Sequence, residues 1–289
     1  MGRGVATWLV TGAATGFGNA IAAKALDAGD RVIATARDPG ALAKLVEPFG
    51  DRAMALALDV TDPAAAADIV RLAEARIGHG IDVIVNAAGY ALIGAVEEVS
   101  DSELRLLMET HFFGAVAVTR AALPGMRARR RGHIFNFSSI AGVDPTPGTA
   151  HYSAAKFAIE GFSEGLAKEV AGFGIKVTVV EPGAFQTRFF TGSSGRTAQI
   201  EIADYAKAVG PFRQLVTNPP AWCPGDPERG AEAIVRLALD PAAPMRLPLG
   251  AVAHQAVTAA LSRRIEEASA FRGVSIAADF PEAAGRSWP

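Results

Sequence analysis

Short apolar runs alternate with longer amphipathic segments through most of the chain. The apolar runs are rich in valine and isoleucine and show no strict alternation with polar residues, which is typical of strands buried on both faces. Strands are predicted at 7–10, 31–36, 53–58, 81–86, 132–138, 175–181 and 245–249. The amphipathic segments predict helices at 16–28, 41–46, 63–77, 101–126, 152–172 and 228–239, the fourth capped by Asp101 or Ser102.

This order of elements predicts an α/β fold. Strands that alternate with helices pair in parallel, because each helix returns the chain to the same edge of the sheet. We therefore expect a doubly wound, Rossmann-like parallel sheet flanked by helices, in a single domain that spans residues 1–289. The alternation stops near Pro182, and the segment 183–226 is rich in Gly, Pro, Ser and Thr. We expect this segment to be an irregular insertion in the domain.

Composition and charge exclude several classes of protein. Half of the 289 residues are hydrophobic, which is enough for a large buried core and too many for a disordered chain. The net charge of −2 gives no indication of a nucleic-acid or membrane partner. We expect no signal peptide, and no apolar run approaches the roughly 18 residues of a membrane span. The single cysteine, Cys223, agrees with the cytoplasmic location that we expect.

Three residues carry the candidate chemistry. Tyr152 and Lys156 are four positions apart on a predicted helix, so their side chains leave the same face, and Ser139 precedes Tyr152 by thirteen positions. An ammonium group close to a phenol stabilises the phenolate and lowers the pKa of the phenol. A tyrosine paired with a lysine can therefore give and take a proton near neutral pH.

A glycine-rich turn, Thr11-Gly12-Ala-Ala-Thr15-Gly16-Phe17-Gly18, follows the first predicted strand and opens the first helix. Glycines let the backbone approach a pyrophosphate, and the helix N-terminus supplies N–H donors and partial positive charge. The alternative is a tight strand-to-helix turn without a ligand. The flanking strand and helix favour a cofactor site, and with the tyrosine and lysine they predict carbonyl and alcohol chemistry on a nicotinamide cofactor.

The spacing G-x-x-x-G-x-G resembles the cofactor turn of the short-chain dehydrogenase/reductase family, which has the form TGxxxGxG. Other family motifs follow in order: Asn86-Ala-Ala-Gly89 after the fourth strand, Ser139 after the fifth, Tyr152-Ser-Ala-Ala-Lys156, and Pro182-Gly183 after the sixth. The resemblance covers residues 5 to about 187 closely. It implies a cofactor half at about 1–135, a catalytic half at about 136–289, and a lid over the active site at about 183–226.

The resemblance also implies a role for each matching residue. Tyr152 would be the general acid and base, Lys156 would lower its pKa and hold the nicotinamide ribose, and Ser139 would bind the substrate oxygen. The cofactor contacts implied, besides Tyr152 and Lys156, are Gly12, Thr15, Gly16, Phe17, Gly18, Asp59, Val60, Asn86, Ala88, Gly89, Pro182, Gly183 and Thr187. Two of these have structural alternatives: Asp59 as a strand-end cap, and Asn86 as a tie between neighbouring strands.

One family position differs. The fourth helix of the family carries Asn in an N-x-x-G setting, where it completes a proton path behind the lysine, and this chain has His111-Phe-Phe-Gly114. A histidine can also donate and accept hydrogen bonds and titrates near neutral pH, so His111 is a candidate relay residue. The alternative is a buried packing residue.

The end of the second strand indicates which cofactor is bound. In NAD-dependent relatives an acidic residue pairs there with the ribose 2′-hydroxyl, whereas this chain has Ala36 followed by Arg37. A guanidinium suits a 2′-phosphate, so we expect NADP(H) rather than NAD(H). The alternative is a solvated Arg37 with Asp38 on the ribose.

The remaining features concern partners. The basic run Arg127-Ala-Arg-Arg-Arg131 ends a helix, where cations complement the dipole, and it does not indicate nucleic acid. The other histidines are scattered, so we expect no metal. Aromatic residues in the lid indicate a hydrophobic small-molecule substrate; they are Phe185, Phe189, Phe190, Tyr205, Phe212 and Trp222. Two alternatives stay open: a non-catalytic cofactor-binding regulator, and a dehydratase or epimerase. A homodimer or homotetramer is expected.

Overall fold

The computed structural model describes residues 4–78, 80–187, 194–218, 220–280 and 283. Within these residues the main sheet has seven strands in the order β3-β2-β1-β4-β6-β7-β9, and all neighbours are parallel. The prediction of a doubly wound parallel sheet is confirmed, with every predicted strand present. Their bounds are β1 (Thr7–Thr11), β2 (Arg31–Ala36), β3 (Ala53–Ala57), β4 (Val83–Asn86), β6 (Gly132–Phe137), β7 (Ile175–Pro182) and β9 (Arg246–Leu249).

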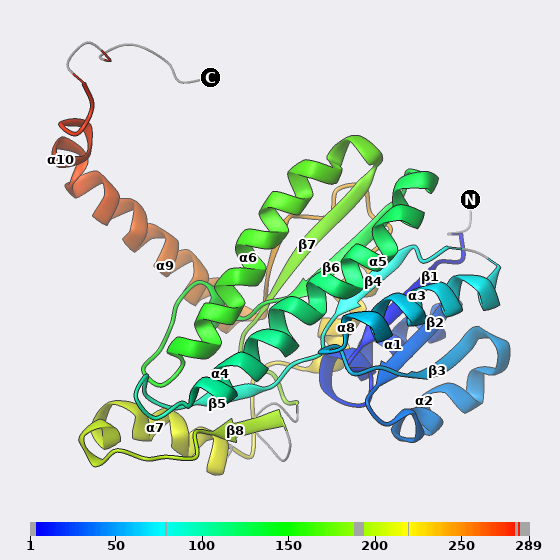
Figure 1. Ribbon diagram of the computed structural model, residues 1–289, viewed down its shortest axis with the longest axis horizontal. Coiled ribbons are helices and arrows are strands. Elements are labelled where there is room, and N and C mark those ends of the chain that lie inside the picture. Colours follow the sequence, from blue (N-terminus) through cyan, green and yellow to red (C-terminus); the bar gives the residue numbers. More distant parts are fainter. Residues whose placement is uncertain (1–3, 79, 188–193, 219, 281–282, 284–289) are drawn as a thin grey trace.

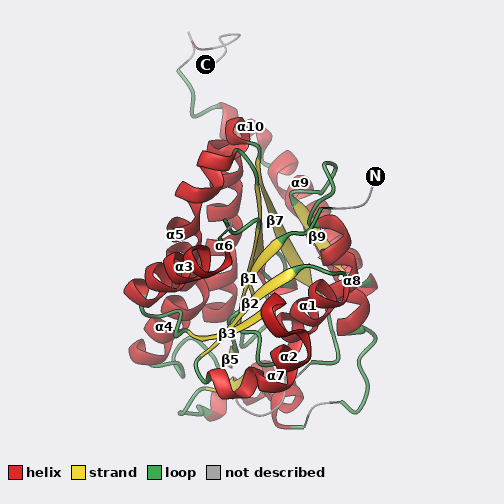
Figure 2. Cartoon of the chain, turned by 90° about the vertical axis from the view of Figure 1, so that its right-hand side faces the viewer, coloured by secondary structure: helices red, strands yellow, loops and turns green. Residues whose placement is uncertain are grey.

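Helices cover both faces of this sheet (Figures 1 and 2). One face packs against α3 (Pro63–Ile77), α5 (Gly114–Arg129) and α6 (Ala150–Val170), and the other against α1 (Gly16–Asp27) and α8 (Pro227–Leu237). The short helix α2 (Ala43–Val46) lies between β2 and β3. Because helices cover both faces, successive strand residues are all buried, which explains the continuous apolar runs in the sequence.

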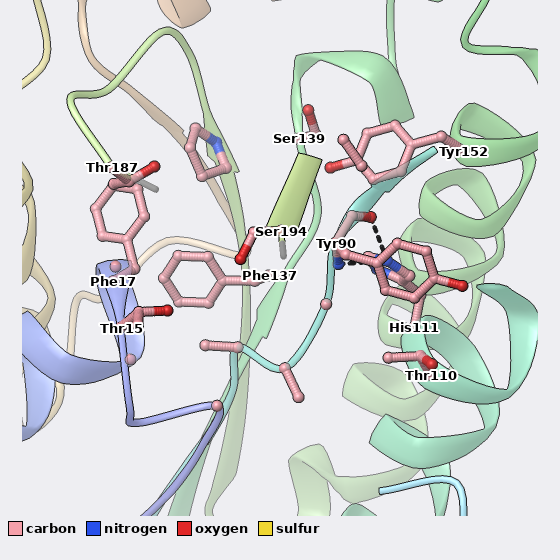
Figure 3. Close-up of a pocket in the computed structure, with 18 of the residues that line it drawn as sticks. Thr15, Phe17, Tyr90, Thr110, His111, Phe137, Ser139, Tyr152, Thr187 and Ser194 are labelled. Carbon is pink, nitrogen blue, oxygen red and sulfur yellow. Dashed lines mark hydrogen bonds between the residues drawn. The ribbon is translucent and has the colours of Figure 1, made fainter. Parts of the chain in front are cut away.

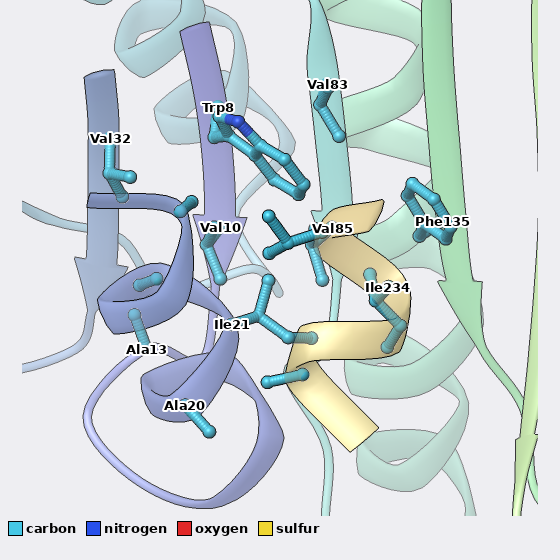
Figure 4. Close-up of a cluster of buried hydrophobic side chains, with 14 of the residues drawn as sticks. Trp8, Val10, Ala13, Ala20, Ile21, Val32, Val83, Val85, Phe135 and Ile234 are labelled. Atoms are coloured by element: carbon cyan, nitrogen blue, oxygen red, sulfur yellow. The ribbon is translucent and has the colours of Figure 1, made fainter. Parts of the chain in front are cut away.

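Figure 4 shows the hydrophobic core beside α1 and α8. Alternate side chains of β1 belong to this core and to the core on the opposite face of the sheet. Trp8 and Val10 of β1 belong to this cluster, whereas Leu9 belongs to the cluster on the opposite face. The indole of Trp8 is fully buried, and its Nε1 donates to Asp30 Oδ2 at 2.8 Å. The hydrogen bond satisfies the one polar atom of the indole, so the ring can fill the core without an unpaired donor.

The predicted helix 101–126 differs from the observed one in two ways. It begins with α4 (Asp101–Met108), and its N-cap is Ser100, not Asp101 or Ser102: the Ser100 hydroxyl accepts from Glu103 N, and the Glu103 carboxylate accepts from Ser100 N. It is also interrupted by a π-helical turn, Glu109–Phe113, before α5. Such a turn inserts one extra residue and is frequent at functional sites.

The segment 183–226 is less irregular than predicted. It contains β8 (Gly195–Thr197), which pairs in parallel with β5 (Ala91–Ile93), and α7 (Ala206–Thr217). The internal Gly210-Pro211 hid α7 from the sequence analysis, but the helix is stabilised because Val209 packs against Ile93. The predicted lid residues Phe189 and Phe190 lie outside the described residues.

The C-terminal part adds two helices that the sequence analysis did not identify, α9 (Ala251–Ala270) and α10 (Arg272–Ile276). They extend away from the body of the molecule (Figure 1). Among the helices of the described residues, none is both long enough and apolar enough to cross a lipid bilayer.

The arrangement of the strands places the loops that carry the sequence motifs. The strand order reverses direction between β1 and β4, which lie side by side in the sheet. In doubly wound sheets the crevice at the carboxyl end of the strands, at such a reversal, is the usual ligand site. The glycine-rich turn follows β1, the Asn-Ala-Ala-Gly motif ends β4, Ser139 follows β6, and Gly183 follows β7.

Candidate active site

A cavity of about 750 Å³ runs along the carboxyl ends of the strands. Its wall is formed by the turns after β1, β2, β3, β4, β6 and β7, by α6, and by parts of the segment 194–223. All but one of the predicted site residues line it: Gly12, Thr15, Gly16, Phe17, Gly18, Arg37, Asp59, Val60, Ala88, Gly89, His111, Ser139, Tyr152, Lys156, Pro182, Gly183 and Thr187. The structure therefore brings together residues as far apart in the sequence as Gly12 and Thr187.

Asn86 is the exception, and its contact with the cofactor stays a prediction. Its side chain is buried and does not line the cavity. The amide Nδ2 donates to Asn136 Oδ1 at 2.8 Å and to Thr119 Oγ1 at 3.1 Å. Asn86 therefore ties β4 to β6 and α5, as the structural alternative in the sequence analysis stated.

The glycines of the turn after β1 are required by close backbone approach. Gly12 has a φ of 67°, and a Cβ there would lie 2.9 Å from Ala88 Cα. A Cβ on Gly18 would lie 2.5 Å from Gly12 O, so α1 can start this close to β1 only without a side chain. Thr15 is the N-cap of α1, but its hydroxyl makes no capping hydrogen bond. The turn thus offers free backbone N–H donors and a free hydroxyl to an anionic ligand.

Ser139, Tyr152 and Lys156 all line the cavity, and Figure 3 shows the hydroxyl groups of Ser139 and Tyr152 side by side. Ser139 precedes a 3-10 turn, Ile140–Gly142, and its Oγ accepts from Ala141 N at 3.2 Å. Lys156 lies one turn after Tyr152 on α6, with its Nζ 5.5 Å from the centre of the Tyr152 ring. The same Nζ donates to Phe137 O at 2.8 Å, which anchors the lysine to the end of β6.

Burial sets the protonation of this group. It raises the pKa of the Tyr152 phenol, and the hydrogen bond with Ser139 opposes the rise without cancelling it. Burial also lowers the pKa of Lys156 from 10.5 to about 7, opposed by the charge of Glu160. The sequence analysis expected a lowered tyrosine pKa, and in the structure the direction is the reverse because desolvation outweighs the favourable neighbours. Tyr152 is therefore protonated at neutral pH.

Glu160 lies behind Lys156, one further turn along α6. Its carboxylate is buried and forms ion pairs with Arg246, which also pairs with Glu164 and Glu181. Burial raises the pKa of Glu160, and its contacts with Ser138 and Arg246 oppose the rise. The charged residues of this cluster are not among those that line the cavity.

His111 lies in the π-helical turn between α4 and α5 and is buried. Its Nε2 is 3.0 Å from Tyr90 N and 2.8 Å from Tyr90 O, so the tautomer decides which of these groups it binds (Figure 3). The ring stands edge-on to Tyr152 with the centroids 5.5 Å apart. Burial and the nearby Lys156 hold its pKa well below the usual range, so the imidazole is neutral. Its hydrogen bonds favour a packing role, and its place in a proton relay stays a prediction.

Two glycines make room for this arrangement. A Cβ on Gly89 would lie 2.4 Å from His111 Cε1, and a Cβ on Gly114 would lie 2.8 Å from Val60 Cβ. The H-x-x-G spacing therefore lets α5 approach the loop after β3, which brings Val60 to the cavity wall.

The opposite end of the cavity is lined by Arg37, Asp38 and Asp59, all exposed. Asp38 Oδ1 accepts from Gly40 N at 2.9 Å, and Asp59 Oδ1 accepts from Thr61 N and Thr61 Oγ1. Both carboxylates thus stabilise their own turns, whereas Arg37 forms no ion pair within the described residues.

The sequence analysis missed several residues at the substrate end. Tyr90 and Leu106 line this part together with Phe212, which the sequence analysis had named, and Arg196 of β8 places its guanidinium 4.3 Å from the centre of the Tyr90 ring. The position of Tyr90, directly after the Asn-Ala-Ala-Gly motif, could have identified it. Nothing in the sequence marks Arg196, because its place depends on the pairing of β8 with β5. Among the described residues, no group of three or more His, Cys, Asp and Glu side chains could hold a metal ion.

Comparisons with known proteins agree with this arrangement. Residues 6–196 match the family model described as short chain dehydrogenase. The chain is 41% identical over 274 residues to oxidoreductase calM of Penicillium decumbens, covering 91% of this chain and 89% of that protein. A crystal structure of a short-chain dehydrogenase from Streptomyces avermitilis has a TM-score of 0.89 and 45% identity, with 96% of this chain and 100% of that chain covered.

A second solved structure is that of the closed form of serine dehydrogenase complexed with NADP+. It has a TM-score of 0.70 and 31% identity, and the alignment covers 83% of this chain and 93% of that chain. The family model spans the glycine turn, the Asn-Ala-Ala-Gly motif and the tyrosine and lysine of α6, which are the residues that the fold gathers around one cavity. This chain belongs to the short-chain dehydrogenase family and is a dinucleotide-dependent oxidoreductase.

Proposed function

We propose that the protein interconverts a carbonyl and a secondary alcohol with NADP(H), on a hydrophobic substrate, with Tyr152 as general acid and base. The observation that carries the proposal is the single cavity in which Ser139, Tyr152 and Lys156 lie beside a glycine turn with free donors. The turn fits a dinucleotide because it lines the cavity at the N-terminus of α1, where backbone N–H groups suit a pyrophosphate and the Thr15 hydroxyl makes no capping hydrogen bond.

A nicotinamide dinucleotide held between the glycine turn after β1 and Lys156 would supply the hydride to the carbonyl carbon in the reducing direction. Tyr152 is protonated at neutral pH and donates its proton to the oxygen as negative charge develops there. Ser139 hydrogen-bonds to the same oxygen and orients the carbonyl toward the phenol. Lys156 is held by Phe137 O beside the phenol and stabilises the phenolate that remains.

Replacement of the phenol tests this mechanism. Tyr152→Phe removes only the hydroxyl, so cofactor affinity should be retained while kcat falls by about 100- to 10,000-fold. Turnover is measured as NADPH oxidation with a panel of aliphatic and aromatic ketones, and cofactor affinity by fluorescence titration. Wild-type turnover in the variant would exclude Tyr152 as the acid. Cofactor binding without turnover on any ketone would favour the non-catalytic regulator, and product without net NADPH consumption would favour a dehydratase or epimerase.

The preference for NADP(H) is supported by the charges at the adenosine end of the cavity. Arg37 forms no ion pair within the described residues, and Asp38 already accepts a hydrogen bond from Gly40 N at 2.9 Å. A guanidinium can bind a 2′-phosphate with paired hydrogen bonds. Arg37→Met should lower NADPH affinity by about 10- to 100-fold and leave NADH affinity nearly unchanged. Tighter binding of NADH than of NADPH by the wild type would refute the preference.

The hydrophobic substrate is supported by the apolar side chains that line the cavity together with Tyr152. Ile93, Leu106, Phe212, Leu215 and Val252 all line it. Apolar walls of this kind bind the body of a ligand, and a few polar groups orient it. A preference for small charged ketones without an apolar body would contradict this part of the proposal.

A homodimer or homotetramer is also proposed. The surface formed by α4, the π-helical turn and α6 exposes Leu106, Phe113 and Phe157, three large apolar side chains on neighbouring elements. Burial of such side chains between subunits is the usual reason for an exposed apolar patch. Light scattering on the eluted peak of a size-exclusion column measures the mass directly, and a monomer at micromolar concentration would refute association.

A further inference from the structure

The acidic and basic side chains that line the cavity differ in whether they are paired. Three carboxylates reach the wall, and each is engaged: Asp38 and Asp59 bind their own turns, and Asp144 Oδ1 pairs with Arg263 at 2.7 Å. The guanidinium of Arg196, in contrast, has no carboxylate partner among the described residues. It therefore presents an uncompensated positive charge to a largely apolar cavity.

Arg196 is held in place by its stacking on Tyr90. The guanidinium carbon lies 4.3 Å from the centre of the ring, which is close enough for a cation–π interaction. Tyr90 is itself fixed, because its backbone is bound to His111 and only 8% of its surface is exposed. The strand β8 carries Arg196 in register with Leu92 of β5, which sets the height of the guanidinium along the cavity.

A series of ring contacts connects Arg196 with the Tyr152 phenol. Arg196 stacks on Tyr90, the Tyr90 ring lies 5.5 Å from His111, and the His111 ring lies 5.5 Å from Tyr152. The guanidinium is thus connected to the catalytic phenol through a continuous row of rings. Arg196 lines the same cavity as the apolar residues that would contact the body of a ligand.

We propose that Arg196 binds a carboxylate of the substrate, so that the natural substrates are keto acids or hydroxy acids with an apolar body between the two polar ends. This inference rests on the proposed function and names its substrate class. One guanidinium supplies one positive charge in a planar fork, which matches a carboxylate in charge and in geometry. A dianionic phosphate would leave one negative charge uncompensated against apolar walls, so it is the poorer match.

Matched substrate pairs test the proposal. Medium-chain keto acids and their methyl esters share the ketone and the apolar body and differ only in the terminal charge. The wild type should prefer each acid to its ester. Arg196→Met should raise KM for the acids by about 10- to 100-fold and leave KM for the esters and both kcat values nearly unchanged. Arg196→Lys keeps the charge but loses the planar fork, so its KM for the acids should lie between that of the wild type and that of Arg196→Met.

A control separates this effect from damage to the lid. Leu215 lines the same cavity on α7 and is partly exposed, so Leu215→Ala should alter the acids and the esters to the same extent. Equal effects of Arg196→Met on acids and esters would overturn the carboxylate site and leave the proposed function standing. A fall in NADPH affinity in Arg196→Met would assign the guanidinium to the cofactor and overturn the site as well. No turnover of either member of any pair by the wild type would overturn the proposed function and this inference together.

Discussion

Lys156 should lower the stability of the protein at neutral pH. Its side chain is buried, with its Nζ bound to Phe137 O at 2.8 Å, and burial lowers its pKa from 10.5 to about 7. The unfolded chain keeps this lysine charged, whereas the folded state opposes the charge. Lys156→Met removes the titrating group and retains most of the apolar stem, so the variant should be more stable than the wild type at pH 7.

The pH dependence gives the sign and the size of the effect. Between about pH 7 and pH 10.5 the unfolded state binds a proton at Lys156 that the folded state has lost, so wild-type stability rises with pH. Below pH 7 the destabilisation is fully present, and above about pH 10.5 it is absent. Each pH unit within the window corresponds to about 1.4 kcal/mol. Because Lys156 is still half protonated in the folded state at pH 7, the advantage of Lys156→Met should shrink by about 2 kcal/mol between pH 7 and pH 9.

Urea unfolding of the cofactor-free proteins at pH 7, 8 and 9 measures this difference, because other titrating groups cancel between variant and wild type. The carbonyl of Phe137 loses its donor in the variant, which costs about 1–3 kcal/mol at every pH and does not alter the slope. Lys176→Met is the matched control, since the Lys176 amine also donates to a backbone carbonyl, that of Asp240. If the stability advantage of Lys156→Met over the wild type stays constant or grows with pH, the reasoning is refuted.

Three further predictions concern the surroundings of the site. Glu160→Gln removes a charge that raises the pKa of Lys156, so the free energy of unfolding should start to rise with pH at a lower pH than in the wild type. Urea unfolding of Glu160→Gln with and without Lys156→Met measures this change in pH. Gly89→Ala should cost about 1–3 kcal/mol in urea unfolding, because its Cβ would meet the His111 ring at 2.4 Å, and the smaller His111→Asn should relieve part of the loss. Arg213 of α7 forms a buried ion pair with Glu98, so Arg213→Met should cost about 3 kcal/mol and speed proteolysis within the segment 195–217; an unchanged cleavage rate would show that this ion pair does not hold the segment in place.

The sequence predicted the strands because their residues are buried on both faces of the sheet. It predicted that the motifs lie close together because of the topology of the sheet. Val83 and Ile84 are both buried although they point to opposite faces, so the strand reads as a continuous apolar run. Once the strands are parallel, the residues that follow them must meet at one edge of the sheet. That rule alone brings Gly12, Ser139 and Gly183 together, and the structure places all three on the cavity wall.

The sequence left the outcome open where it depends on burial or on distant packing. Asn86 matches a family motif, yet its side-chain amide donates hydrogen bonds to Asn136 and Thr119 in the interior. Helix α7 contains Pro211, which argues against a helix locally, but its apolar side packs against β5. Arg196 had no sequence signal, because β8 acquires its position only by pairing with β5. In each case the deciding interaction joins segments that the local pattern cannot relate.

The reversed pKa directions are instructive about the proposed chemistry. From the sequence, the lysine and the tyrosine form an isolated pair, in which Coulomb attraction favours ammonium and phenolate. In the structure both groups are buried, and desolvation favours the neutral form of each. A neutral phenol is the form that carbonyl reduction requires at its start, whereas alcohol oxidation must start from the phenolate. Under the proposed mechanism, the burial of Tyr152 therefore favours the reducing direction near neutral pH, and oxidation should gain relative rate as the pH rises.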